Sequence, residues 1–139
     1  MDERVTILIA EDNTILAKSI SRCLQQSGYA TCMATSALAT RKVLERNAVS
    51  ALCLDLQFPD GNGLDILETY VRPLCKNIPV VIITGSGSEA DRQRAERSGV
   101  LAFLIKPFAL AELKSIFDDA LGNTCKPADQ ISSRRAVIN

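Results

Sequence analysis

The sequence predicts a three-layer α/β/α domain built on a five-stranded parallel sheet. Five short hydrophobic runs alternate with five segments of helical character along the 139 residues. The runs have no polar face, which is typical of parallel strands covered by helices on both sides. Because crossovers between parallel strands are right-handed, a doubly wound sheet is the default arrangement.

The five predicted strands differ in how clearly the sequence indicates them. The run at 5–10 is too hydrophobic to have a solvent-exposed face, and the run at 79–83 is the strongest because it is rich in β-branched residues. The run at 30–34 is weaker. The remaining two strands are expected at 51–54 and 101–105.

Two predicted helices show a clear hydrophobic stripe. After the first strand, hydrophobic residues recur at the spacing of one helix face, at Leu16, Ile20, Cys23 and Leu24. Gly28 then supplies a C-terminal stop. After the third strand, the same kind of stripe is formed by Leu64, Leu67, Val71 and Leu74.

The other three helices are defined mainly by their ends. Ser36 can cap a helix that runs to about Asn47. The segment 88–98 ends at Gly99 and is mostly charged, so its thin hydrophobic stripe predicts a loosely held helix. The last helix, stopped by Gly122, carries Leu110, Leu113, Phe117, Ala120 and Leu121.

The domain is expected to cover residues 1–122. Residues 123–139 have no sustained periodicity and are predicted to be a flexible tail or a linker. Such a tail is too short for a DNA-binding or enzymatic domain. The protein is therefore either a stand-alone domain that acts by protein contact or a part of a longer protein.

Composition excludes several classes of function. Sixteen basic residues balance sixteen acidic ones, which argues against direct nucleic-acid binding. The absence of histidine excludes zinc hydrolases and His-based triads. No hydrophobic run approaches the length of a membrane helix, and the N-terminus lacks the layout of a signal peptide.

The cysteines favour a reducing, cytoplasmic location. There are five, and none forms a CxxC pair. Four fall in predicted strands or helices and are expected to be small buried hydrophobic residues, namely Cys23, Cys32, Cys53 and Cys75.

Charged and polar residues follow four of the five strands. Glu11 and Asp12 come after the first strand, Asp55 ends the third, Thr84 follows the fourth, and Lys106 follows the fifth. Ligands of doubly wound sheets bind beyond the carboxyl ends of the strands, so we expect these side chains to meet at one edge.

Three carboxylates at one edge repel one another. Two unit charges about 4 Å apart interact by about 4 kcal/mol at an effective dielectric constant of 20. Protonation, a neighbouring cation or a metal ion could relieve this repulsion, and Lys106 alone supplies too little charge. A site of oxygen ligands without His or Cys suits Mg²⁺ or Mn²⁺, and a phosphoryl group is the natural companion of such an ion.

Four segments resemble the receiver domain of two-component response regulators. They are Ile9-Ala10-Glu11-Asp12-Asn13, the segment 54–63 around Asp55, Ile82-Ile83-Thr84-Gly85 and Lys106-Pro107-Phe108. The resemblance covers about residues 5–121. It implies the flavodoxin-like strand order 2-1-3-4-5 and transfer of a phosphoryl group from a kinase phosphohistidine to an aspartate.

The resemblance also implies roles for individual residues. Asp55 matches the phosphoacceptor, Asp12 the direct metal ligand and Glu11 the second acidic position. The backbone carbonyl of Gln57 matches the third protein ligand of Mg²⁺. Lys106 matches the lysine that pairs with the phosphoryl oxygens, and the Lys106-Pro107 bond is cis in the family.

Thr84 and Phe103 match the switch pair of the family. The Thr84 hydroxyl would donate to a phosphoryl oxygen and move inward, and the aromatic ring would rotate into the vacated space. Phe replaces a common Tyr at this position, so no phenolic hydrogen bond can report the state. Family members signal through the fourth helix, fifth strand and fifth helix.

The resemblance implies binding partners for the domain, and three alternative functions remain open. The expected partners are a sensor histidine kinase or phosphotransfer protein and, for output, another protein or a second copy of the chain. We expect no direct contact with nucleic acid or membrane, and no enzymatic activity beyond the domain's own phosphorylation and dephosphorylation. The alternatives are a Mg²⁺-dependent phosphohydrolase of related topology, a flavin-binding electron carrier and a non-phosphorylated, protein-binding pseudo-receiver.

Overall fold

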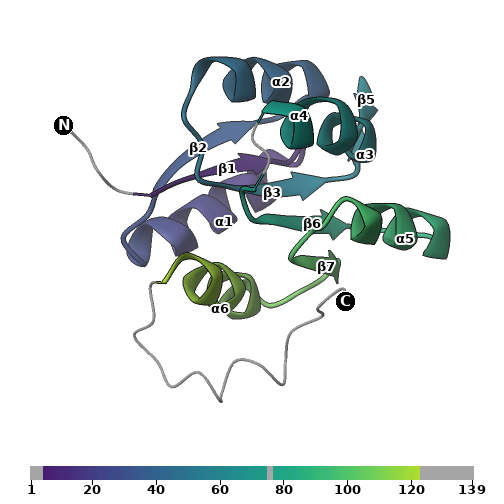
Figure 1. Ribbon diagram of the computed structural model, residues 1–139. Coiled ribbons are helices and arrows are strands. Elements are labelled where there is room, and N and C mark those ends of the chain that lie inside the picture. Colours follow the sequence, from purple (N-terminus) through teal and green to yellow (C-terminus); the bar gives the residue numbers. More distant parts are fainter. Residues whose placement is uncertain (1–4, 75–76, 123–139) are drawn as a thin grey trace.

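The computed structural model describes residues 5–74 and 77–122 and is built on one parallel sheet (Figure 1). The five strands are β1 (Thr6–Ala10), β2 (Ala30–Ala34), β3 (Ala51–Asp55), β6 (Val80–Thr84) and β7 (Ala102–Ile105). Their order is β2-β1-β3-β6-β7, and every pairing is parallel. The predicted order 2-1-3-4-5 of the five hydrophobic runs is therefore confirmed.

Helices cover both faces of the sheet, which gives the predicted three layers (Figure 1). On one face, α1 (Thr14–Gln26) and α6 (Leu110–Leu121) pack against a hydrophobic cluster that includes Ile9, Val81 and Phe117. On the other, α2 (Ala37–Arg46), α3 (Gly63–Ile66) and α5 (Glu89–Arg97) contribute to a second cluster. The strands β3 and β6 are buried along their whole length.

The glycine stops and the Ser36 cap follow the predicted signals, and the caps at Asn13 and Ser88 are additional to them. The side chains of Asn13, Ser36 and Ser88 accept hydrogen bonds from backbone N–H groups in the first turns of α1, α2 and α5. Gly28, Gly99 and Gly122 adopt positive φ angles beyond the C-terminal ends of α1, α5 and α6. These conformations are readily available to glycine and end each helix.

The predicted third helix is not uniform. It consists of α3, a π-helical segment η1 (Leu67–Val71) and α4 (Arg72–Leu74). The N–H of Arg72 bonds to the carbonyl of Leu67, five residues earlier. The π segment ends two residues before Pro73, which has no N–H to donate to an α-helical ladder.

The extra residue in this π segment changes the hydrophobic stripe. Leu64, Leu67 and Val71 are buried as predicted, but Leu74 is 58% exposed. The prediction that Leu74 belongs to the stripe is therefore wrong. One inserted residue rotates the following turn, so Leu74 leaves the core-facing side.

A small hairpin not predicted from the sequence precedes α3. β4 (Gln57–Phe58) and β5 (Gly61–Asn62) pair antiparallel. Between them, the Asp60 carboxylate accepts hydrogen bonds from Ala37 N (2.8 Å) and Leu38 N (3.1 Å) at the start of α2. These bonds lower the pKa of Asp60 and join the hairpin to that helix.

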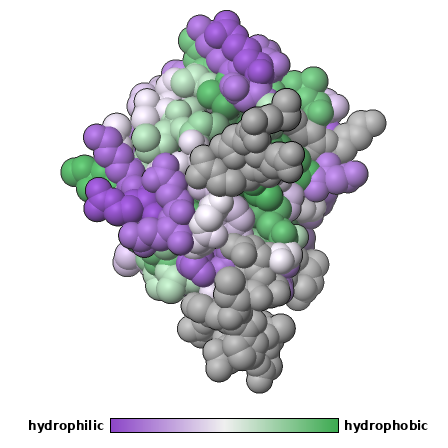
Figure 2. Space-filling view, turned by 90° about the vertical axis from the view of Figure 1, so that its left-hand side faces the viewer, coloured by the Kyte–Doolittle hydropathy of each residue, from purple (hydrophilic) through white to green (hydrophobic). Residues whose placement is uncertain are grey.

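The surface of the domain and the burial of its cysteines can be compared with the predictions. Among the described residues, none of the helices combines the length and hydrophobicity needed to cross a bilayer. On the face shown in Figure 2, hydrophobic side chains are scattered among hydrophilic ones. Cys53 is buried, but Cys32 on the edge strand β2 and Cys23 on α1 are only half-buried, so full burial of these two was a wrong prediction.

Two predictions fall outside the described part of the chain. Cys75 and the segment 123–139, predicted to be a flexible tail or linker, both lie there.

The π segment predicts that the same leucine-to-alanine substitution lowers the free energy of unfolding by different amounts at two positions. Leu67→Ala should reduce the free energy of unfolding by about 2–5 kcal/mol, because it leaves a cavity in the core. Leu74→Ala should change it by less than about 0.5 kcal/mol, because the side chain is largely in solvent. Urea unfolding of both variants measures the difference, and similar losses would contradict the observed rotation.

Candidate functional site

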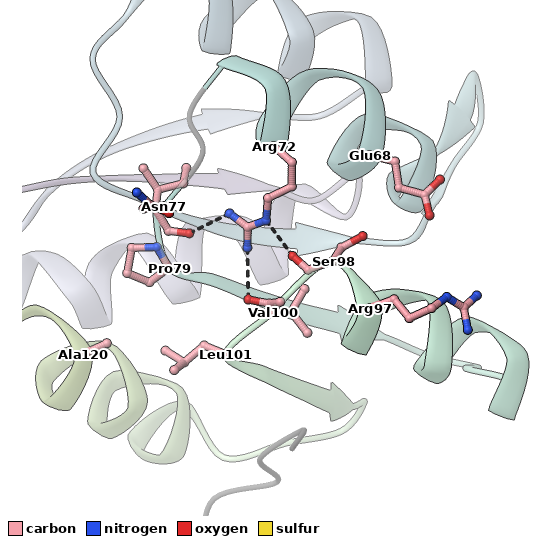
Figure 3. Close-up of a pocket in the computed structure, with 11 residues that line it drawn as sticks. Glu68, Arg72, Asn77, Pro79, Arg97, Ser98, Val100, Leu101 and Ala120 are labelled. Atoms are coloured by element: carbon pink, nitrogen blue, oxygen red, sulfur yellow. Dashed lines mark hydrogen bonds between the residues drawn. The ribbon is translucent and has the colours of Figure 1, made fainter.

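The predicted site residues gather at the carboxyl edge of the sheet. A cavity of about 480 Å³ there is lined by Glu11, Asp12, Asn13, Asp55, Gln57, Phe58, Pro59, Gly85 and Lys106. We call it the acidic pocket. A larger cavity, of about 780 Å³, lies beside Pro79 and Leu101 at the other edge and contains none of the predicted site residues (Figure 3).

The strands place three carboxylates around one point. Glu11 follows β1 directly, Asp55 ends β3, and Asp12 is the next residue after Glu11. One carboxylate oxygen from each lies within 4.8 Å of the others. Glu11 is fully buried, Asp55 is 3% exposed, and Asp12 is exposed to solvent. The predicted convergence of the three acids is therefore present in the structure.

Lys106 lies between two of these acids. Its Nζ is 2.7 Å from Glu11 Oε1 and 3.1 Å from Asp55 Oδ2. Backbone N–H groups hold the other oxygens, since Asn13 N donates to Glu11 Oε2 (2.9 Å) and Gln57 N donates to Asp55 Oδ1 (3.1 Å). The two buried carboxylates are thus fixed in orientation as well as in position.

The electrostatic balance of the acidic pocket is incomplete. Burial raises the pKa of Glu11, and the nearby Asp55 adds to this effect, while Lys106 and Asn13 N oppose it. Burial opposes the charge of Lys106 in turn, but the two carboxylates raise its pKa overall. Three acids therefore face one ammonium group in the pocket.

The donor set fits a hard divalent cation. Carboxylate oxygens without nitrogen or sulfur are the ligands that Mg²⁺ and Mn²⁺ prefer. Glu11 Oε1 is buried and, apart from its ion pair with Lys106, has no hydrogen-bond partner among the described residues. A cation beside Glu11, Asp12 and Asp55 would offset the charge that Lys106 leaves uncompensated.

Thr84 and Phe103 lie beside the pocket rather than in its lining. Thr84 is fully buried at the end of β6, and Ser86 N donates to its hydroxyl oxygen at 3.4 Å. Phe103 is buried in β7. A Cβ on Gly87 would lie only 2.6 Å from the Phe103 ring and 3.3 Å from Thr84 Cγ2. The backbone at Gly87 therefore rests against both members of the predicted switch pair.

Some contacts of the site were not predicted. Gln57 Nε2 donates to Ser86 Oγ (3.2 Å), which links the residue two positions after Asp55 to the loop after β6. Gly63 N donates to Leu56 O (2.8 Å), and a Cβ on Gly63 would lie 2.2 Å from the carbonyl oxygen of Asp55. The sequence marks Gly63 only as part of a turn. The Lys106-Pro107 bond is cis, as the resemblance implied.

The sheet order and the acidic pocket define a doubly wound α/β domain with a cluster of acids at the carboxyl edge of its sheet, and comparison identifies the family. The chain belongs to the response regulator receiver domain family, whose model matches residues 7–118. It is a family of signalling domains, not of classical enzymes.

Individual relatives agree with this assignment. The swarming motility regulation protein RssB of Serratia marcescens is 34% identical over 80% of this chain and 50% of its own length. The transcriptional regulatory protein BasR of Escherichia coli is 36% identical over 77% and 48%. The chain thus spans about half the length of these relatives. A CheY-like receiver domain protein from Methanospirillum hungatei shares the fold, with a TM-score of 0.83 at 23% identity over 87% of this chain and 96% of that one.

The close approach of Gly63 to Asp55 predicts a steric requirement. Gly63→Ala should lower the free energy of unfolding by about 1–3 kcal/mol, because the new methyl group overlaps the backbone carbonyl of Asp55. Gly85→Ala is the control, since a Cβ there meets nothing within 4 Å. Chemical denaturation compares the two, and an equally stable Gly63→Ala variant would disprove the requirement.

Proposed function

We propose that the chain is a phosphoaccepting receiver that takes a phosphoryl group onto Asp55 and changes conformation for signal output. The observation that carries this proposal is the position of Asp55 in the acidic pocket. Its carboxylate is nearly buried, is oriented by Gln57 N and Lys106, and lies beside two further acids. A carboxylate in this setting can act as a nucleophile toward phosphorus.

The proposed reaction is a direct phosphoryl transfer. An oxygen of Asp55 attacks the phosphorus of a phosphohistidine on a sensor kinase or phosphotransfer protein. A P–O bond forms to Asp55 while the P–N bond to the donor breaks, and the nitrogen keeps the electron pair. Lys106, now 3.1 Å from Asp55 Oδ2, would pair with the transferred oxygens and balance their charge.

Glu11, Asp12, Asp55 and the backbone carbonyl of Gln57 are the proposed ligands of Mg²⁺, with Mn²⁺ as a substitute. Bound there, the cation would neutralise charge on the transferring group. The residues of the chain have separate tasks. Asn13 N orients Glu11, Gln57 N orients Asp55, and the buried position of both acids limits access of water to the acceptor.

Thr84 and Phe103 are the proposed switch pair. Phosphorylation replaces one carboxylate charge with about −1.5 to −2 on a larger group. The Thr84 hydroxyl makes long contacts with Ser86, of 3.4 and 3.5 Å, and can exchange them for a shorter bond to a phosphoryl oxygen. Because Gly87 rests on both residues, their movement would displace the loop that leads into α5.

Output by protein contact is favoured over other functions. A second copy or another protein would bind the face formed by α5, β7 and α6. The family assignment argues against a phosphohydrolase and against a flavin-binding electron carrier. The acidic pocket argues against a non-phosphorylated pseudo-receiver. The domain would catalyse only its own phosphorylation and dephosphorylation.

Phosphorylation of Asp55 can be tested by intact mass. With Mg²⁺ and acetyl phosphate, the wild-type chain should gain one phosphoryl group, and Asp55→Asn should abolish this gain because the amide is not a nucleophile of this kind. Asp91→Asn, outside the acidic pocket, should be phosphorylated like the wild type. Absence of phosphorylation in the wild type with several donors and metals would refute the proposed function.

Metal binding can be tested by stability. Mg²⁺ at about 100 times its dissociation constant should raise the free energy of unfolding by about 2.7 kcal/mol, because it binds the folded state only. Asp12→Asn should lose most of this gain, and the exposed Glu45→Gln should keep it. Thermal unfolding with KCl at matched ionic strength is the measurement, and an equal effect of the two salts would exclude a specific site.

A further inference from the structure

The helix α5 has little hydrophobic contact with the rest of the domain. Of its nine residues, Ala95 is the only one that is buried, and six of the nine are charged. Burial of one alanine provides little of the stabilisation that holds a helix in place. Polar contacts must therefore determine where α5 lies.

Arg94, in the middle of α5, makes the main polar contact with α3 and η1. Its Nε donates to Glu68 Oε2 (2.8 Å), and its Nη2 donates to Glu68 Oε1 (2.7 Å) and to Asp65 Oδ1 (2.7 Å). We call this contact the Arg94 bridge. The Arg94 and Glu68 side chains are only 33% and 35% exposed, and the contact lowers the pKa of Glu68 and raises that of Arg94. The contact between Arg94 and Glu68 is a bidentate ion pair, in which two parallel hydrogen bonds fix the geometry.

A second arginine fixes the C-terminal end of α5 (Figure 3). Arg72, on α4, donates to Ser98 O (2.6 Å), Gly99 O (3.1 Å) and Ile78 O (3.1 Å). Ser98 and Gly99 directly follow the last residue of α5. Ser98 is the C-cap of α5, and its carbonyl is one of those that a helix end leaves without internal partners. Arg72 therefore anchors this end of α5 to the beginning of β6.

The N-terminal end of α5 leads to the proposed switch pair. Residues 85–88 connect Thr84 to α5 and are exposed, and Gly87 in this segment rests against the Phe103 ring. A shift of Thr84 would pull this end while Arg72 holds the other. The Arg94 bridge lies between the two, so α5 cannot turn about its anchored end unless the bridge yields.

We propose that the Arg94 bridge is an autoinhibitory contact that holds α5 in the position of the unphosphorylated domain. It opposes the displacement of α5 that follows phosphorylation of Asp55. The inhibitory part of this inference rests on the proposed function, whereas the restraint of α5 by the bridge does not. Breaking the bridge should free α5 and ease phosphorylation without any change in the acidic pocket.

The restraint is tested by amide hydrogen exchange in the absence of phosphodonor. Arg94→Gln and Glu68→Gln should each speed hydrogen exchange of the α5 amides by about three- to tenfold. A half-buried ion pair is expected to contribute more than a fully exposed ion pair and less than a set of buried charge-assisted hydrogen bonds. Arg92→Gln, an exposed arginine of the same helix, is the matched control. Exchange in β3 and β6 should stay unchanged. Equal exchange of α5 in all variants, or faster exchange throughout the sheet, would overturn the proposal.

The inhibitory role is tested by the initial rate of phosphorylation with Mg²⁺ and acetyl phosphate. Arg94→Gln and Glu68→Gln should react several-fold faster than the wild type and Arg92→Gln. Unchanged rates in variants with freed α5 amides would overturn the autoinhibitory role. A wild type that is never phosphorylated would instead refute the proposed function and leave the exchange result to decide whether the bridge restrains α5.

Discussion

The ion pairs of Lys106 with Glu11 and Asp55 are the interaction on which the acidic pocket depends. They exist because the register of the sheet brings the ends of β1, β3 and β7 to the same edge, with β6 between β3 and β7. Ala10 pairs with Leu54 and Thr84 pairs with Ile105, so Glu11, Asp55 and Lys106 all emerge at one edge. A one-residue slip of any of these strands would reverse the faces of its side chains and bury or remove the charged group. The hydrophobic core and the charged pocket therefore depend on the same register.

Much of this arrangement could be predicted because each strand carries its own signal. The hydrophobic runs are continuous, and the charges interrupt them at corresponding ends, so the meeting of Glu11, Asp55 and Lys106 follows from local sequence. The strand order came instead from the resemblance to the receiver family. The π segment before Pro73 was not predicted. The pattern of Leu64, Leu67, Val71 and Leu74 fits an ordinary α-helix, and only the backbone shows the extra residue.

The contacts that were missed join residues far apart in the chain. Gln57 and Ser86 are 29 positions apart, and Arg94 and Glu68 are 26 apart. Nothing in the periodicity of either segment indicates such pairs. For α5 the sequence predicted weak hydrophobic packing correctly, but it could not show that arginines on two elements compensate for it. Gly63 is a similar case, because its requirement for a small residue comes from the Asp55 carbonyl and not from its own turn.

The distribution of rigid and polar contacts determines how a charge in the acidic pocket could act at a distance. The strands β3 and β6 are buried throughout, so added charge at Asp55 cannot be accommodated by movement of the sheet. The segment 85–88 that follows Thr84 is exposed instead, and a Cβ at Gly85 would meet nothing within 4 Å. The segment leads directly into a helix held by ion pairs, which, unlike a packed core, have alternative partners in water. Movement would therefore be channelled from Thr84 into α5, the element whose position depends least on hydrophobic burial.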